Sequence, residues 1–87
     1  MTYKEFQDIA IDLVYNYTIS HLDKTDHVDF THDNVYIVWE CKALQNHKAL
    51  LSTTLYDGMY YEVTYNGDKN EVYFDAYKKF ENKKIEL

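Results

Sequence analysis

The hydrophobic positions of the first twenty residues recur with a helical period. At about 100° per residue, seven apolar side chains share one broad stripe: Tyr3, Phe6, Ile9, Ala10, Leu13, Val14 and Tyr17. Thr2 and Glu5 form a capping-box pattern, in which two side chains satisfy free backbone amides at the start of a helix. The pattern predicts an amphipathic helix from residue 3 to residue 20 or 21, with its stripe toward the core.

Residues 22–34 show no sustained period and are expected to form a connector, held to the core by Val28 and Phe30. From residue 35 the pattern alternates, which is typical of β-strands. Four strands are expected, at about 35–42, 48–54, 59–65 and 70–74, separated by turns at 43–47, at 56–58 and after residue 65.

In the first strand, alternation predicts one apolar face toward the helix: Val35, Ile37, Trp39 and Cys41. With Trp39 in the core, we expect Trp39→Ala to cost about 3–5 kcal/mol of stability. The opposite face of the sheet would carry polar and aromatic groups, which form a secondary candidate surface: Tyr36, Glu40, Tyr60, Glu62 and Tyr73.

Asn66-Gly67 is the strongest hairpin signal in the chain. A two-residue loop would set Glu62 opposite Glu71, and directly opposed like charges are destabilising. We therefore favour a four-residue loop, 66–69, which pairs Val63 with Val72.

Asp75 can cap a short last helix at about 76–83, with lysines in its later turns. The expected fold is α+β, with an N-terminal helix, a four-stranded antiparallel meander and a short C-terminal helix. It forms a single domain of residues 1–87.

A second apolar row lies on the predicted helix outside the core stripe. Ile11, Tyr15 and Ile19 are spaced four residues apart, and Asp8 and Asp12 border them. An apolar row rimmed by charge is typical of interaction surfaces, so these five residues are the candidate partner-binding site. Three explanations stay open: cover by the connector or last helix, a symmetric homodimer, or a foreign protein partner.

The charge distribution favours a protein partner over nucleic acid. The 87 residues include fifteen acids, nine lysines and no arginine, with a net charge of −6. Residues 1–40 hold eight acids and two lysines, so the whole net charge lies in this half. Such a face attracts basic partners and repels nucleic acid, and arginine is the preferred donor to phosphates and bases. The ten tyrosines are common at interfaces, but codon bias in an AT-rich genome would also enrich them.

Two groups of residues have side chains that could bind a metal or act in catalysis, but neither group matches a known motif. The connector interleaves histidines and aspartates, which are metal-ligand types, but their spacing matches no known ligand set: His21, Asp23, Asp26, His27, Asp29, His32 and Asp33. Cys41 and His47 could form a nucleophile and its base, but Cys41 fits better as a buried thiol. We therefore expect no catalytic residues, no metal site and no cofactor.

No apolar run approaches the roughly 20 residues that span a bilayer, and no start typical of a signal peptide is visible. Together with a single cysteine, this predicts a reduced intracellular location without membrane contact.

Several stretches resemble a known family. They are residues 35–46 with 48–54, residues 57–68 from Asp57-Gly58-Met59 to Asn66-Gly67-Asp68, and Asp75-Ala76-Tyr77-Lys78-Lys79. They resemble a family of small, uncharacterised proteins encoded by phages and prophages of Gram-positive bacteria. The resemblance implies an accessory gene product in the host cytoplasm and carries no activity.

The expected function is binding to a host or mobile-element protein, which would be modulated or inhibited, with acidic mimicry of nucleic acid as one version. The alternatives are a small metal-dependent enzyme that uses the His/Asp connector and a purely self-associating structural protein.

Overall fold

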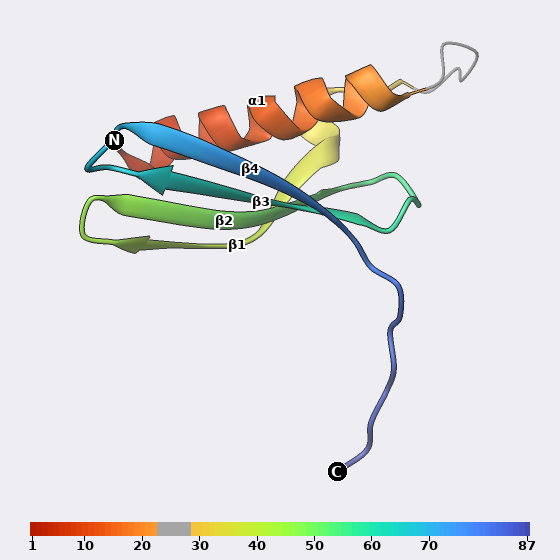
Figure 1. Cartoon of the computed structure of the whole chain (residues 1–87). Coiled ribbons are helices and arrows are strands. Elements are labelled where there is room, and N and C mark those ends of the chain that lie inside the picture. Colours follow the sequence, from red (N-terminus) through yellow and green to blue (C-terminus); the bar gives the residue numbers. More distant parts are fainter. Residues whose placement is uncertain (23–28) are drawn as a thin grey trace.

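The computed structural model describes residues 1–22 and 29–87, and it shows one helix lying across one face of a four-stranded sheet (Figure 1). The elements are α1 (Tyr3–His21), the short 3-10 helix η1 (His32–Asn34), β1 (Val35–Ala43), β2 (Asn46–Thr53), β3 (Met59–Asn66) and β4 (Glu71–Lys78). All neighbouring strands are antiparallel and follow chain order across the sheet. The predicted helix and meander are confirmed.

The start of α1 follows the predicted capping box. The Thr2 hydroxyl accepts a hydrogen bond from the Glu5 amide at 3.1 Å, and the Glu5 carboxylate accepts one from the Thr2 amide at 3.2 Å. These hydrogen bonds with Thr2 also lower the pKa of the Glu5 carboxyl. Two of the free amides at the helix start are thus satisfied by side chains of the chain itself.

Thr2→Ala should lower the free energy of unfolding by about 1 kcal/mol, because the first turn of α1 loses its cap. Urea unfolding followed by circular dichroism would measure the change. Thr54→Ala, at an exposed position beyond β2, is the matched control and should stay within about 0.5 kcal/mol of wild type. Equal effects at both positions would contradict a capping role for Thr2.

The core lies between α1 and the sheet. Phe6, Ala10 and Val14 point from the helix, and Leu51 and Val63 from the central strands, all without exposed surface. Phe30 is also buried, so its predicted contact with the core is confirmed. Val28 lies outside the described residues. The main hydrophobic cluster is therefore a single layer, enclosed by the helix on one side and the sheet on the other.

A β-bulge in β1 overturns part of the predicted strand face. Ile37 pairs with Leu51 and Trp39 with Leu50, so Val38 is an extra residue without a partner in the register. The bulge turns Trp39 and Cys41 away from the helix, and Trp39 is 44% exposed. The prediction that these two side chains lie in the core is wrong, and the large cost expected for Trp39→Ala no longer follows.

The same bulge moves Glu40 to the helix side. Glu40 pairs with buried Ala49, and the side-chain amide of Gln7 in α1 donates a hydrogen bond to its carboxylate. Glu40 was expected on the outer face with Tyr36, and this placement is wrong because alternation holds only while no residue is inserted.

The β3–β4 hairpin has a four-residue loop, as predicted, but it comprises residues 67–70. Val63 therefore faces Phe74 instead of Val72, a shift of two positions that leaves each side chain on its predicted face. The Asn66 side chain accepts from the Asp68 amide at 3.1 Å, and Asn70 takes a left-handed φ of 52°. These two asparagines fix where the loop begins and ends.

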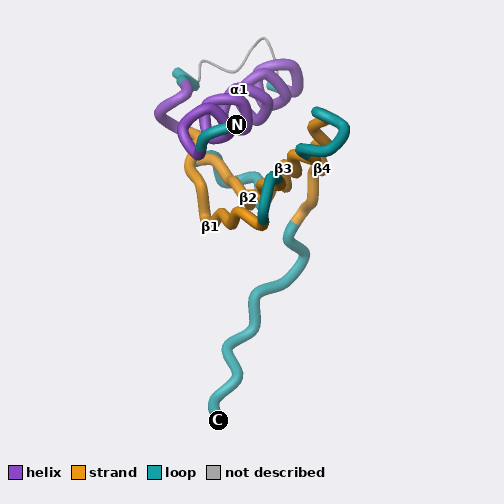
Figure 2. The backbone as a smooth tube through the Cα atoms, turned by 90° about the vertical axis from the view of Figure 1, so that its left-hand side faces the viewer, coloured by secondary structure: helices purple, strands orange, loops and turns teal. Residues whose placement is uncertain are grey.

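The predicted C-terminal helix is absent, and its first residues belong to β4. Asp75 pairs with Glu62 instead of capping a helix, and Ala76 and Tyr77 continue the ladder along β3. An eight-residue β3 offers backbone groups along its whole length, and a short helix would leave those at its start unpaired. Residues 79–87 then form an irregular tail that leaves the body on the side of the sheet opposite α1 (Figures 1 and 2).

That side of the sheet has no covering layer among residues 1–22 and 29–87. We call it the open face, and the side chains in its outward register include Tyr36, Trp39, Cys41, Lys48, Leu50, Ser52, Tyr60, Glu62, Thr64, Tyr73, Asp75 and Tyr77. Among the described segments, no helix has the length and apolar character required to cross a membrane.

Candidate partner-binding site

The chain itself covers the middle of the predicted apolar row. The Tyr15 ring stacks on His32 with ring centroids 3.8 Å apart, and on Phe30 with centroids 5.9 Å apart. Both partners belong to the predicted connector, in the part of it that leads back to the sheet. Of the three explanations for the apolar row, cover by the connector therefore holds for Tyr15.

The remaining residues of the row have different surroundings. Ile11 lines a groove between α1 and η1 with a volume of about 550 Å³. Ile19 lies two turns further along the helix and is 42% exposed. Sequence spacing correctly placed the three side chains on one side of the helix, but the structure divides the row between a stack, a groove and solvent.

This groove, which we call the acidic groove, has apolar walls and a charged rim. Its lining comes from α1 and η1: Asp8, Ile9, Ile11, Asp12, His32 and Asp33. The Asp12 carboxylate lies 3.0 Å from His32 Nε2, and this contact joins η1 to α1. Lys4 contacts Asp8 at 2.8 Å, but the side chains of both remain largely exposed. The groove therefore offers carboxylates to solvent beside isoleucine side chains.

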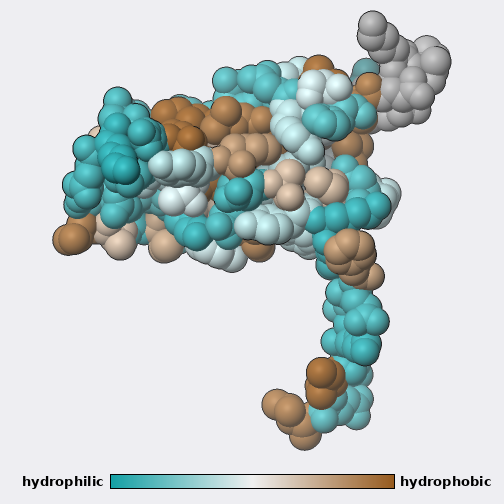
Figure 3. Space-filling view, viewed as in Figure 1, coloured by the Kyte–Doolittle hydropathy of each residue, from teal (hydrophilic) through white to brown (hydrophobic). Residues whose placement is uncertain are grey.

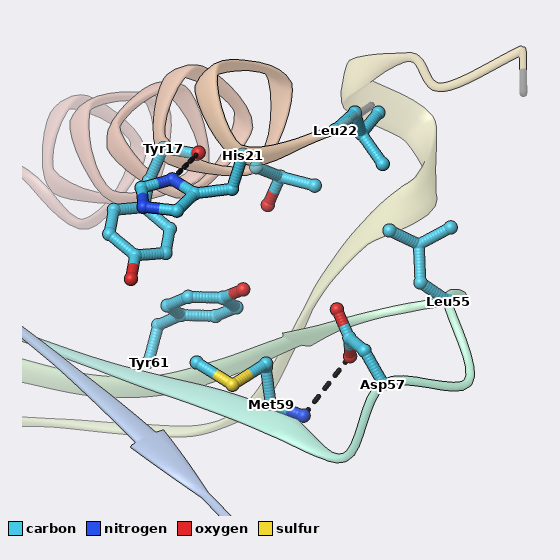
Figure 4. A pocket seen from close by; sticks show the side chains of 8 residues that line it. Tyr17, His21, Leu22, Leu55, Asp57, Met59 and Tyr61 are labelled. Carbon is cyan, nitrogen blue, oxygen red and sulfur yellow. Dashed lines mark hydrogen bonds between the residues drawn. The ribbon is translucent and has the colours of Figure 1, made fainter. Parts of the chain in front are cut away.

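A second hollow lies where α1 ends near the β2–β3 loop (Figure 4). It has a volume of about 230 Å³, and its labelled walls include Tyr17, His21, Asp57, Met59 and Tyr61. His21 Nδ1 is 2.8 Å from the Tyr17 carbonyl oxygen, and burial raises the pKa of the Tyr61 phenol. Sequence reasoning missed this hollow because its residues come from a helix, a loop and a strand that no local pattern connects.

The possible nucleophile and base are placed on opposite faces of the sheet. Cys41 is exposed on the open face, whereas His47 is buried on the helix side, where its ring stacks on Phe6 with centroids 5.0 Å apart. Their side chains cannot form a hydrogen-bonded pair through the sheet.

The connector histidines are only partly described. His21 contacts the backbone of Tyr17 and His32 contacts Asp12, so these two belong to different sites. Asp23, Asp26 and His27 lie outside the described residues. Within residues 1–22 and 29–87, no three His, Cys, Asp or Glu side chains come close enough together to hold a metal ion.

The secondary surface has four of its five predicted residues. Tyr36, Tyr60, Glu62 and Tyr73 all lie on the open face, and Glu40 does not. A hydrogen bond to Glu71 at 2.6 Å raises the pKa of the Tyr73 phenol. The bulge adds Trp39 to this surface, which alternation alone had assigned to the core.

The chain belongs to a family of unknown function, DUF6275, whose sequence profile matches residues 7–87. The match covers nearly the whole chain, including every helix and strand described above except the first turn of α1. Comparison with curated proteins gives no match, and neither does comparison with solved structures.

Proposed function

We propose that this member of the family is a phage-encoded accessory protein of the host cytoplasm that binds a host or mobile-element protein. The observation that supports this proposal is the acidic groove, which combines apolar walls with exposed carboxylates. Such a groove fits a basic segment with an apolar anchor residue. Binding would modulate or inhibit the partner by occupying its basic surface, without catalysis.

Each part of the groove has a distinct role in such binding. Ile9 and Ile11 offer apolar area, whose removal from water stabilises the complex. Asp8 and Asp33 are exposed and attract a basic partner over longer distances. Because the net charge of residues 1–40 is strongly negative, this attraction extends beyond the groove itself. The same carboxylates could take the place of phosphates on a nucleic-acid-binding protein.

The test is affinity capture with two charge-matched variants, one that changes the groove and one that serves as its control. Asp8→Lys with Asp33→Lys reverses the groove, and Glu81→Lys with Glu86→Lys makes the same change of charge on the exposed tail. We expect a host protein that is captured by wild type and by the tail variant but lost with the groove variant. With purified partner, the groove variant should bind about tenfold more weakly or worse, and wild-type binding should weaken as salt rises.

Retention of the partner by the groove variant, or binding that does not depend on salt, would contradict the proposal. Competition with double-stranded DNA tests separately whether the protein acts as an acidic mimic of nucleic acid. If carboxylates replace phosphates, DNA should displace the protein from its partner, and the absence of displacement would refute mimicry.

A further inference from the structure

The open face is an aromatic surface without a cover from the described part of the chain. Tyr36, Trp39, Tyr73 and Tyr77 are each 44–51% exposed. They surround a central row in which Leu50, Glu62 and Asp75 follow one another across three strands. Aromatic groups around a small centre that contains charged residues are common in protein interfaces and rare on free surfaces of this extent.

The C-terminal tail begins beside this face. The Lys79 amide donates to the Gly58 carbonyl at 2.8 Å, and the Lys79 ammonium lies 5.7 Å from the centre of the Tyr60 ring. The chain then leaves the body on the open-face side (Figures 1 and 2). Its three large apolar side chains are almost fully exposed: Phe80, Ile85 and Leu87. Figure 3 shows hydrophobic atoms at the start and at the tip of the tail.

We propose that the open face is a homodimer interface, in which two copies pack sheet against sheet and the tail of each lies along the other copy. This proposal is independent of the acidic groove, which lies in the helix layer on the other side of the sheet.

The area of the surface supports a second copy with its tail. Four strands of about eight residues, spaced about 4.8 Å apart with a rise of about 3.3 Å, cover roughly 500 Å². A standard interface buries about 800 Å² of accessible surface on each partner, so additional area from the tail would help the face to reach this size. The nine residues 79–87 extend over about 30 Å, which is enough to cross a partner sheet. Their apolar side chains supply this additional area.

The centre of the open face is acidic, and the tail holds lysines that can reach it. Lys48 pairs with Glu62 at 2.9 Å, and Asp75 stands directly opposite Glu62 in the register. The face therefore holds two carboxylates around one ammonium at its centre. Lys83 and Lys84 lie in the tail between the apolar residues, where Lys83 contacts Glu81 at 3.6 Å and Lys84 contacts Glu86 at 3.1 Å. Because these two ion pairs are exposed, a partner's tail can exchange one of them for a contact between an ammonium and Asp75 while its apolar side chains contact the tyrosines.

The single tryptophan makes the interface directly observable. Trp39 lies on the open face, so its emission should shift to shorter wavelength as the protein associates. Sedimentation equilibrium between about 1 μM and about 500 μM should show a mass rising from 10.5 kDa toward twice that value. The emission shift and the mass should follow the same concentration dependence.

Three variants test which surface is responsible. Tyr73→Lys should remain monomeric, with unchanged circular dichroism and long-wavelength Trp39 emission. Replacing Phe80, Ile85 and Leu87 by serine should weaken the dimer about tenfold or more. Asn16→Lys, at an exposed position of α1 on the other side of the sheet, is the control and should dimerise like wild type. If Tyr73→Lys does not fold, Tyr36→Lys on β1 provides the same test.

Several results would overturn the proposal. A wild-type protein that stays monomeric over the whole range would refute it, whether its tail folds onto its own sheet or a foreign protein covers the face. A dimer that Ile11→Lys disrupts and Tyr73→Lys preserves would place the contact on α1 instead. A dimer unaffected by the serine substitutions would refute the role of the tail.

Discussion

Phe6→Ala should destabilise the protein by about 3–5 kcal/mol, the usual cost of removing a large aromatic side chain from a core. Phe6 has no exposed surface and stacks on the buried His47 ring, at the point where α1 crosses β2. Truncation would leave a cavity between helix and sheet and would expose the imidazole to it. A loss of this size is a large part of the total stability of a small domain.

Urea unfolding would measure this effect. All variants should be compared at the same protein concentration, because self-association would then contribute equally to each of them. Phe6→Leu should cost clearly less than Phe6→Ala because it leaves a smaller cavity, and it remains measurable if Phe6→Ala does not fold. Tyr56→Ala removes an aromatic ring of similar size from a fully exposed position and should change stability by about 0.5 kcal/mol or less. A loss below about 1 kcal/mol for Phe6→Ala would contradict the described core.

Local patterns were sufficient for the elements whose determinants are close in sequence. The capping box at Thr2 and Glu5 predicted the start of α1, and the helical stripe predicted the burial of Phe6, Ala10 and Val14. Two other members of that stripe do not lie in the core, because Tyr3 is 48% exposed and Ile9 lines the acidic groove. Alternation in β3 correctly placed Tyr60 and Glu62 on the outer face, and the residues between and after them, Tyr61, Val63 and Tyr65, are buried. In each case the residues that form the structure lie within a few positions of one another.

The errors arise where a distant part of the chain decides the structure. The segment that begins at Ala76 was predicted as helical from its own composition, but the free edge of β3 pairs with it and extends β4. A bulge at Val38 cannot be recognised from a continuous apolar alternation, and it reverses the side of every later residue in β1. Trp39 and Glu40 exchanged faces for this reason.

The candidate site, like the fold, could be predicted from the sequence only where its residues lie close together along the chain. Periodicity placed Ile11 and Tyr15 beside Asp8 and Asp12, but it could not show that Phe30 and His32 return to stack on Tyr15. The acidic groove exists because η1 lies against α1, a contact between residues about twenty positions apart. The secondary surface gained Trp39 only through the bulge.

Gly67→Ala should destabilise the protein by about 1–3 kcal/mol through overpacking between two turns. Sequence reasoning treated Asn66-Gly67 as a hairpin signal, in which glycine supplies a positive φ. In the structure the residue with positive φ in this loop is Asn70, and Gly67 is needed for a different reason. A Cβ at Gly67 would collide with the backbone carbonyl oxygen of Gln45 and would lie 2.6 Å from its Cγ.

Hydrogen bonds link the β1–β2 turn to the β3–β4 loop on both sides of this close contact. The Gly67 amide donates to the Asn46 side chain at 2.9 Å, and the Gln45 side-chain amide donates to Asp68. An alanine would therefore have to separate the β1–β2 turn from the β3–β4 loop and lose these contacts. Gln45→Gly in the same chain should restore only part of the stability, because the carbonyl oxygen remains.

Two controls separate steric from conformational effects in the same urea experiment. Lys69→Ala, at an exposed loop position, should stay within about 0.5 kcal/mol of wild type. Gly58 has a φ of 70° but space for a Cβ, whose nearest neighbour would be the Lys79 carbonyl oxygen at 3.5 Å. Gly58→Ala should therefore cost about 1–2 kcal/mol from backbone strain alone. If Gly67→Ala were as stable as Lys69→Ala, the two turns would not be in contact, and the loop would serve only to reverse the chain.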